Sequence, residues 1–126
     1  MESQSNKISA AVYDSSDAVG VTVTQVTKPT PSRNKCLIKV MACGINPVDA
    51  KYELGDKLPE GQRWVRLSRS IVNTHVVGFD FSGYVEQTFE GSKFNVGDEV
   101  FGLMPPMSGS FAEYITIREN ALSLKP

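Results

Sequence analysis

Residues 77–86 read VGFDFSGYVE. Apolar side chains fall at alternate positions with polar side chains between them, which is typical of a strand that buries one face. The same alternation recurs elsewhere, at residues 8–13, 21–24, 36–42, 99–103 and 111–117. We predict a strand in each of these stretches. In the stretch at residues 36–42 the predicted buried face carries Cys36, Ile38, Val40 and Ala42.

Turn residues separate the predicted strands. Residues 28–34 contain two prolines, and residues 94–98 contain Gly97, which is suited to a positive φ. One short helix is expected at residues 46–53, where Asn46 is a candidate N-cap and Pro47 fits the first helical position. A long polar loop follows. Many short strands separated by Gly and Pro predict a mainly β protein, a barrel or a sandwich, with one or two short helices.

Size and composition exclude several classes of protein. The chain has 126 residues, enough for one domain, with 40% hydrophobic residues, 21% charged residues and a net charge of −1. No basic stripe is present, which argues against nucleic-acid binding. No apolar run is long enough to cross a membrane, and residues 1–11 lack the pattern of a signal peptide, so a cytoplasmic location is expected. Cys36 and Cys43 would lie roughly 23 Å apart on one strand, so reduced thiols are expected.

No G-x-G-x-x-G fingerprint occurs in the chain, so the sequence predicts no dinucleotide-binding motif of its own. Four other motifs occur in order: INPVD at residues 45–49, VGFDFSG at 77–83, VGDEVFG at 96–102 and GSFAEY at 109–114. In this order and spacing they resemble the medium-chain dehydrogenase/reductase superfamily, and specifically its zinc-free quinone oxidoreductase branch. The resemblance covers the chain from about Ile8 to Pro126.

The resemblance implies a fold and an activity. Residues 1–126 would form the GroES-like domain, a partly open β-barrel, and a Rossmann cofactor domain is expected downstream, since the chain ends about where the connection to it would begin. The implied activity is NADPH-dependent reduction of a quinone or an α,β-unsaturated carbonyl, in a protein that is a homodimer at full length. This domain alone would be inactive.

Zinc is not expected. Zinc-dependent relatives supply a Cys, a His and an acid from this domain. Aligning Cys43-Gly44-Ile45 with their first motif places Asn46 at the Cys ligand, and aligning Gly78 with the second places Phe79 at the His ligand and Asp80 at the acid. An amide oxygen and a phenyl ring do not replace a thiolate and an imidazole on Zn²⁺. The resemblance therefore implies no metal.

The resemblance also implies site residues. Asn46 and Asp49 match an Asn-Pro-x-Asp motif whose Asn and Asp face the cofactor, so they are the catalytic and cofactor-contacting candidates. Tyr52, Trp64 and Asp80 are candidates for lining the substrate cleft. Relatives often place Tyr directly after the Asp, which weakens a proton-donor role for Tyr52.

Structural alternatives remain open for each candidate. Asn46 could be only a helix cap, and Asp49 an acid favoured by the helix dipole. Asp80 alternates with its aromatic neighbours and could simply hydrogen-bond a loop, and Trp64 could be a packing residue. For the whole protein, the alternatives are a non-catalytic binding or adaptor protein with the same fold, and a free-standing co-chaperonin-like barrel.

Overall fold

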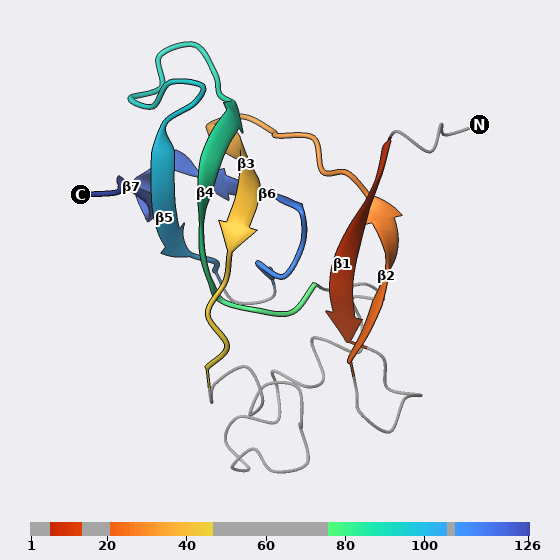
Figure 1. Ribbon diagram of the computed structural model, residues 1–126. Helices are drawn as coiled ribbons and strands as arrows, with labels where there is room; N and C mark the ends of the chain where they lie inside the picture. The colour runs from red at the N-terminus through yellow and green to blue at the C-terminus, as the bar shows by residue number, and fades with distance from the viewer. Residues whose placement is uncertain (1–5, 14–20, 47–75, 106–107) are drawn as a thin grey trace, which may run out of the picture.

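The computed structural model describes residues 6–13, 21–46, 76–105 and 108–126. They form two antiparallel sheets (Figure 1). The smaller sheet pairs β1 (Lys7–Tyr13) with β2 (Val21–Thr27). The larger sheet has the order β6-β3-β4-β5-β7, with β3 at Lys35–Ala42, β4 at Asp80–Gln87, β5 at Glu99–Leu103, β6 at Tyr114–Arg118 and β7 at Leu122–Leu124. A short 3₁₀ helix, η4 (Glu119–Ala121), leads into β7. The prediction of a mainly β protein is confirmed.

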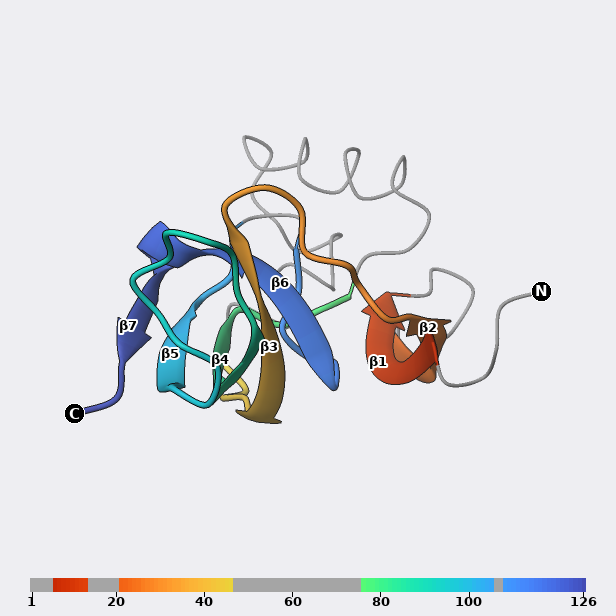
Figure 2. The ribbon, with the colours of Figure 1, turned by 90° about the horizontal axis from the view of Figure 1, so that it is seen from above.

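The larger sheet curls into half a barrel, and the β1–β2 hairpin stands beside its β6 edge (Figure 2). Two segments outside the strands join the sheets. Ala11 N–H donates to the Phe111 carbonyl at 2.8 Å, and Val77 N–H donates to the Ala11 carbonyl at 3.0 Å. The Val40 N–H of β3 donates to the carbonyl of Glu113 at 2.9 Å. The result is the partly open barrel that the sequence predicted.

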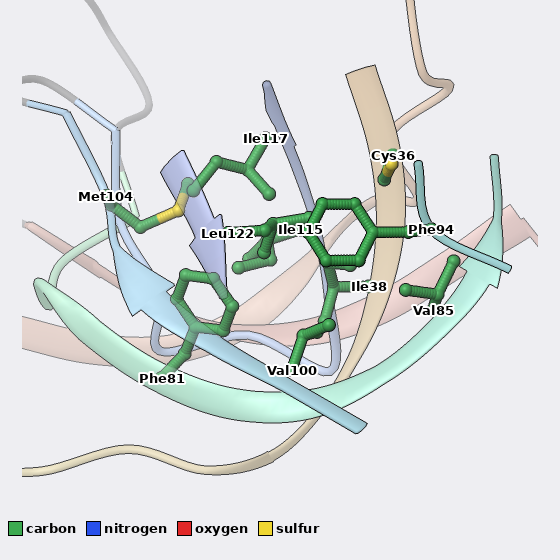
Figure 3. Packing of buried hydrophobic residues seen from close by; sticks show 10 residues of the cluster. All are labelled: Cys36, Ile38, Phe81, Val85, Phe94, Val100, Met104, Ile115, Ile117 and Leu122. Carbon is green, nitrogen blue, oxygen red and sulfur yellow. The ribbon is translucent and has the colours of Figure 1, made fainter. Parts of the chain in front are cut away.

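The core lies on the concave side of the larger sheet, where Phe81, Phe94 and Met104 point toward one another (Figure 3). Ile38, Val85, Val100 and Cys36 are fully buried, one or two from each central strand. Burial of a Val or Ile side chain contributes about 1.5–3 kcal/mol. The alternation seen in the sequence therefore does place one face of each central strand in the core.

Most predicted strands are confirmed, and the differences have local causes. The strand predicted from residue 77 begins only at Asp80, because Gly78 has φ +101 and turns the chain before β4. The strand predicted from residue 111 begins at Tyr114, because residues 111–113 instead bond to β1. Ala42 is exposed, since the register of β3 against β4 shifts between Val40 and Ala42. β7 was not predicted.

The turn predictions are also met where they are described. Residues 28–34 form a loop, and Gly97 has φ +94 in the turn before β5. The helix predicted at residues 46–53 and the polar loop after it lie outside the described residues, apart from Asn46 itself.

The two sheets meet where the backbone of residues 76–78 passes against that of residues 109–111. A Cβ added to Gly109 would overlap the carbonyl groups of Val76 and Val77. Phe111 N–H donates to the Val77 carbonyl at 2.9 Å across the same contact. Only glycine permits this approach at position 109, so that residue is required by packing rather than by a turn.

We expect Gly109→Ala to lower the free energy of unfolding by at least about 3 kcal/mol, because backbone atoms that cannot rotate away would have to shift. Gly91→Ala is the control: Gly91 has φ +89 but nothing within 4 Å of an added Cβ, so it should cost only about 1–2 kcal/mol. Urea denaturation of the three proteins measures both values. Equal losses would show that the contact at Gly109 relaxes easily.

Candidate functional site

The candidate site forms where β3 ends and β4 begins. The two strands are antiparallel and pair Ala42 with Ser82, so the chain after β3 runs back beside the residues that open β4. Extending that register by two residues brings Gly44 opposite Asp80. Figure 1 shows the segment after β3 and the segment before β4 at the same end of the sheet. Residues about 35 positions apart in sequence thus become neighbours.

Asp80 is the centre of this neighbourhood. Gly44 N–H donates to Asp80 Oδ1 at 2.5 Å, and Asn46 Nδ2 donates to Asp80 Oδ2 at 2.8 Å. Each carboxylate oxygen therefore accepts a bond from the segment that follows β3. Hydrogen bonds to an ionised carboxylate are shorter and stronger than those between neutral groups. Asn46 and Asp80, two of the candidates from the sequence, are brought into direct contact.

The segment after β3 is held from its other side as well. The thiol of Cys43 donates to the carbonyl of Ser110 at 3.2 Å, and Ser110 is fully buried. Both cysteines are free thiols, and Cys36 lies fully buried with its Sγ 3.4 Å from Thr88 Oγ1. A Cβ added to Gly44 would lie 2.7 Å from Asp80 Oδ2. The backbone of residues 43–44 is thus fitted closely between Ser110 and Asp80.

A depression of about 780 Å³ opens beside Asp80. Its walls come from the end of β3, the start of β4, the end of β5 and the segment around β7. The lining residues include Cys43, Gly44, Asp80, Phe101, Leu103 and Ser123. Phe101 and Leu103 are exposed, and both point away from the core side of β5, where Val100 is buried. The depression is therefore an open apolar surface whose described lining carries one carboxylate, that of Asp80.

The charge of this surface limits what it can bind. A carboxylate attracts a cationic or hydrogen-bond-donating group and repels phosphates. The surface is therefore suited to a cationic or hydrogen-bond-donating group rather than to a phosphate. Within the described residues, no three His, Cys, Asp or Glu side chains lie close enough to hold a metal ion.

Not all predicted site residues can be placed. Asp49, Tyr52 and Trp64 lie outside the described residues. The sequence reasoning missed Gly44, Phe101 and Leu103. Phe101 and Leu103 carried a signal, since two large apolar residues on the outward face of a half-buried strand mark a contact surface. Gly44 carried none, because its role depends on the register of β3 against β4.

None of the helices in the described part of the chain has the length and apolar character needed to cross a membrane.

Residues 32–126 match the family model described as the alcohol dehydrogenase GroES-like domain. Among curated proteins, the chain is 33% identical over 102 residues to the quinone oxidoreductase of Sus scrofa, covering 80% of this chain and 28% of that protein. It is 33% identical over 132 residues to the chloroplastic NADPH-dependent alkenal/one oxidoreductase of Arabidopsis thaliana, covering 95% and 31%.

Among solved structures, the quinone oxidoreductase from Coxiella burnetii superposes with a TM-score of 0.82 at 25% identity. The match covers 95% of this chain and 37% of that one. The chain therefore spans less than a third of the length of the two curated relatives.

A double-mutant cycle tests the close fit at Gly44. We expect Gly44→Ala to lower the free energy of unfolding by about 1–3 kcal/mol, because the new methyl group displaces the Asp80 carboxylate. In an Asp80→Ala background the methyl group has room, so the same change should cost at least about 1 kcal/mol less. Urea denaturation of the four proteins gives the coupling. Additive losses would contradict the contact between Gly44 and Asp80.

Proposed function

The chain belongs to the alcohol dehydrogenase GroES-like domain family, within the medium-chain dehydrogenase/reductase superfamily. From this we propose that it is the catalytic-side domain of an NADPH-dependent oxidoreductase. The enzyme would reduce quinones or α,β-unsaturated carbonyls. The observation that carries the proposal is the bonded pair of Asn46 and Asp80 beside an open apolar depression. The pig relative is a quinone oxidoreductase and the Arabidopsis relative an NADPH-dependent alkenal/one oxidoreductase, which supports the substrate class and the cofactor.

The proposal includes parts that lie beyond residues 1–126. A Rossmann domain downstream would bind the phosphates of NADPH, because the described residues offer a carboxylate rather than a phosphate cradle at the site. Following the family resemblance, the whole protein is a homodimer in the cytoplasm. The acceptor is a small flat carbonyl compound or quinone, which suits the apolar wall of Phe101 and Leu103.

In this reading, the residues of the chain orient and enclose the reactants. NADPH, when bound, supplies the hydride. Asn46 presents an amide that donates and accepts hydrogen bonds without ionising, and it is fixed in place by Asp80. Asp49, three positions further along, is assigned to the same face of the cleft by its motif. Phe101 and Leu103 give the acceptor an apolar wall to lie against.

We also propose that the protein works without zinc. Asn46 and Phe79 occupy the positions at which zinc-dependent relatives have Cys and His, and neither side chain offers zinc a thiolate or an imidazole nitrogen. Both oxygens of Asp80, at the position of the acid, already accept hydrogen bonds within the protein. The ligand positions are therefore used for an amide–carboxylate contact instead.

The zinc content of the purified protein tests this point. We expect elemental analysis after mild dialysis to find far less than one zinc per chain, because Asn46 and Phe79 are not zinc ligands. Prior incubation with zinc salts should leave that content and the melting temperature unchanged. About one tightly held zinc per chain would overturn this part of the proposal.

The catalytic assignment is tested by Asn46→Ala in the protein that includes its cofactor domain. If the amide orients the acceptor or the nicotinamide, kcat/KM for NADPH-dependent quinone or enone reduction should fall by about 10²-fold. Loss of a helix cap alone would instead cost about 1 kcal/mol of stability with little kinetic change. Steady-state kinetics and thermal melts on the same samples separate the two cases.

Asn95→Ala is the matched control, because Asn95 is exposed in the turn at the opposite end of β4 and β5 and should change neither quantity. A wild-type protein with no NADPH-dependent reductase activity, or a destabilised but fully active Asn46→Ala variant, would contradict the assignment.

A further inference from the structure

Asp80 accepts two hydrogen bonds, one from the Gly44 N–H and one from the Asn46 side chain. These bonds suggest that Asp80 acts on Asn46 rather than on the reactants. We propose that Asp80 is a positioning residue that selects and holds one orientation of the Asn46 amide, so that the reaction depends on Asp80 through Asn46. This inference rests on the proposed function, because it assigns Asp80 a role in the same site. Its structural half, the control of Asn46 by Asp80, is testable without any activity.

The carboxylate is itself held rigidly before it acts on Asn46. Gly44 N–H fixes Oδ1 at 2.5 Å, and the backbone of Gly44 lies so close that it leaves no room for a Cβ. Asp80 is also the first residue of β4, and its backbone pairs with Leu103 of β5. With one oxygen fixed by the backbone and Cα fixed by the sheet, the second oxygen has a defined direction. That oxygen meets Asn46 Nδ2 at 2.8 Å.

An ionised carboxylate accepts hydrogen bonds but donates none, and this asymmetry selects one orientation of the amide. A primary amide can turn by half a rotation and exchange its oxygen and its nitrogen. Facing Asp80, only the nitrogen of Asn46 makes a favourable contact, whereas the oxygen would be repelled. Asp80 therefore determines which end of the Asn46 amide faces β4 and, with it, the direction of the amide dipole.

Two anchors hold the backbone two and three residues before Asn46. The Cys43 thiol holds the segment to the Ser110 carbonyl, and Gly44 is held to Asp80. Asn46 comes two residues later and is half-buried. The bond to Asp80 thus acts on the torsions of the Asn46 side chain that the backbone anchors do not fix.

The test compares Asp80→Asn with Asp98→Asn. Both changes remove one negative charge and keep the size of the side chain. Asp98 also accepts a backbone bond, from Asn95 N–H at 2.8 Å, but at the opposite end of β4 and β5. In ¹⁵N NMR spectra of the chain, we expect Asp80→Asn to shift the Asn46 side-chain amide protons and speed their exchange with solvent, whereas Asp98→Asn leaves both unchanged.

In the protein with its cofactor domain, Asp80→Asn should lower kcat by about 10-fold to 100-fold, with a much smaller change in KM, because misorientation acts on the reacting geometry. The exchange Asn46→Asp/Asp80→Asn restores a donor facing an acceptor at the same net charge. It should recover the melting temperature lost in Asp80→Asn but not kcat, because position 46 then presents a carboxylate. It also serves as the second variant if Asp80→Asn does not fold.

Unchanged Asn46 amide signals in Asp80→Asn, or a kcat equal to that of Asp98→Asn, would overturn the positioning role and leave Asp80 a structural residue. A full recovery of kcat in the exchanged protein would overturn it as well. Shifted amide signals in a protein whose wild-type form has no NADPH-dependent reductase activity would instead overturn the proposed function and leave the control of Asn46 by Asp80 intact. The two failures are therefore distinguishable.

Discussion

The close approach of Gly109 to the carbonyl of Val76 is the contact on which the arrangement of the two sheets depends. On one side of it, residues 76–78 lead into β4, and on the other, residues 109–113 lead into β6. Both segments also bond to β1, which joins the hairpin to the larger sheet. The start of β4 is thereby fixed, and Asp80 with it. The position of the Asp80 carboxylate in the site therefore depends on a contact between two backbone segments.

Strands were predicted correctly where one buried face sets the alternation of apolar and polar residues. They were predicted incorrectly where backbone conformation or pairing with a distant strand sets the limits of the strand. Ile38, Val85 and Val100 lie on the core side of three adjacent strands, and each could be read from the period of two. The pattern at residue 77 continued through Gly78, but its φ of +101 ends the extended chain there. β7 has only three residues, and its pairing of Leu124 with Val100 is a tertiary contact that no local pattern carries.

Two residues of the candidate site, Asn46 and Asp80, could be named from the sequence, but the contact between them could not. Asn46 and Asp80 could be named because each belongs to a motif that resembles one family. Their bond could not be foreseen, because it depends on a register that shifts twice between β3 and β4, and each shift of one residue would turn Asp80 to the other side of the sheet. The role of Gly44 follows from the same register. The predictions for Asp49, Tyr52 and Trp64 concern residues outside the described ranges.

The charge of Asp80 also constrains what chemistry its neighbourhood can favour. Like charges about 6 Å apart at an effective dielectric constant of about 20 repel by about 3 kcal/mol. A negative charge that develops beside the carboxylate is therefore penalised by about two powers of ten in rate if nothing offsets it. A group that becomes more positive gains by the same amount. Asn46 is neutral, so it is neither repelled nor attracted as a charge would be. It binds the carboxylate through its nitrogen and separates Asp80 from a reactant on the other side of the amide. A reductase built on this pair would hold the acceptor oxygen away from Asp80 and leave the carboxylate to the side on which positive charge grows.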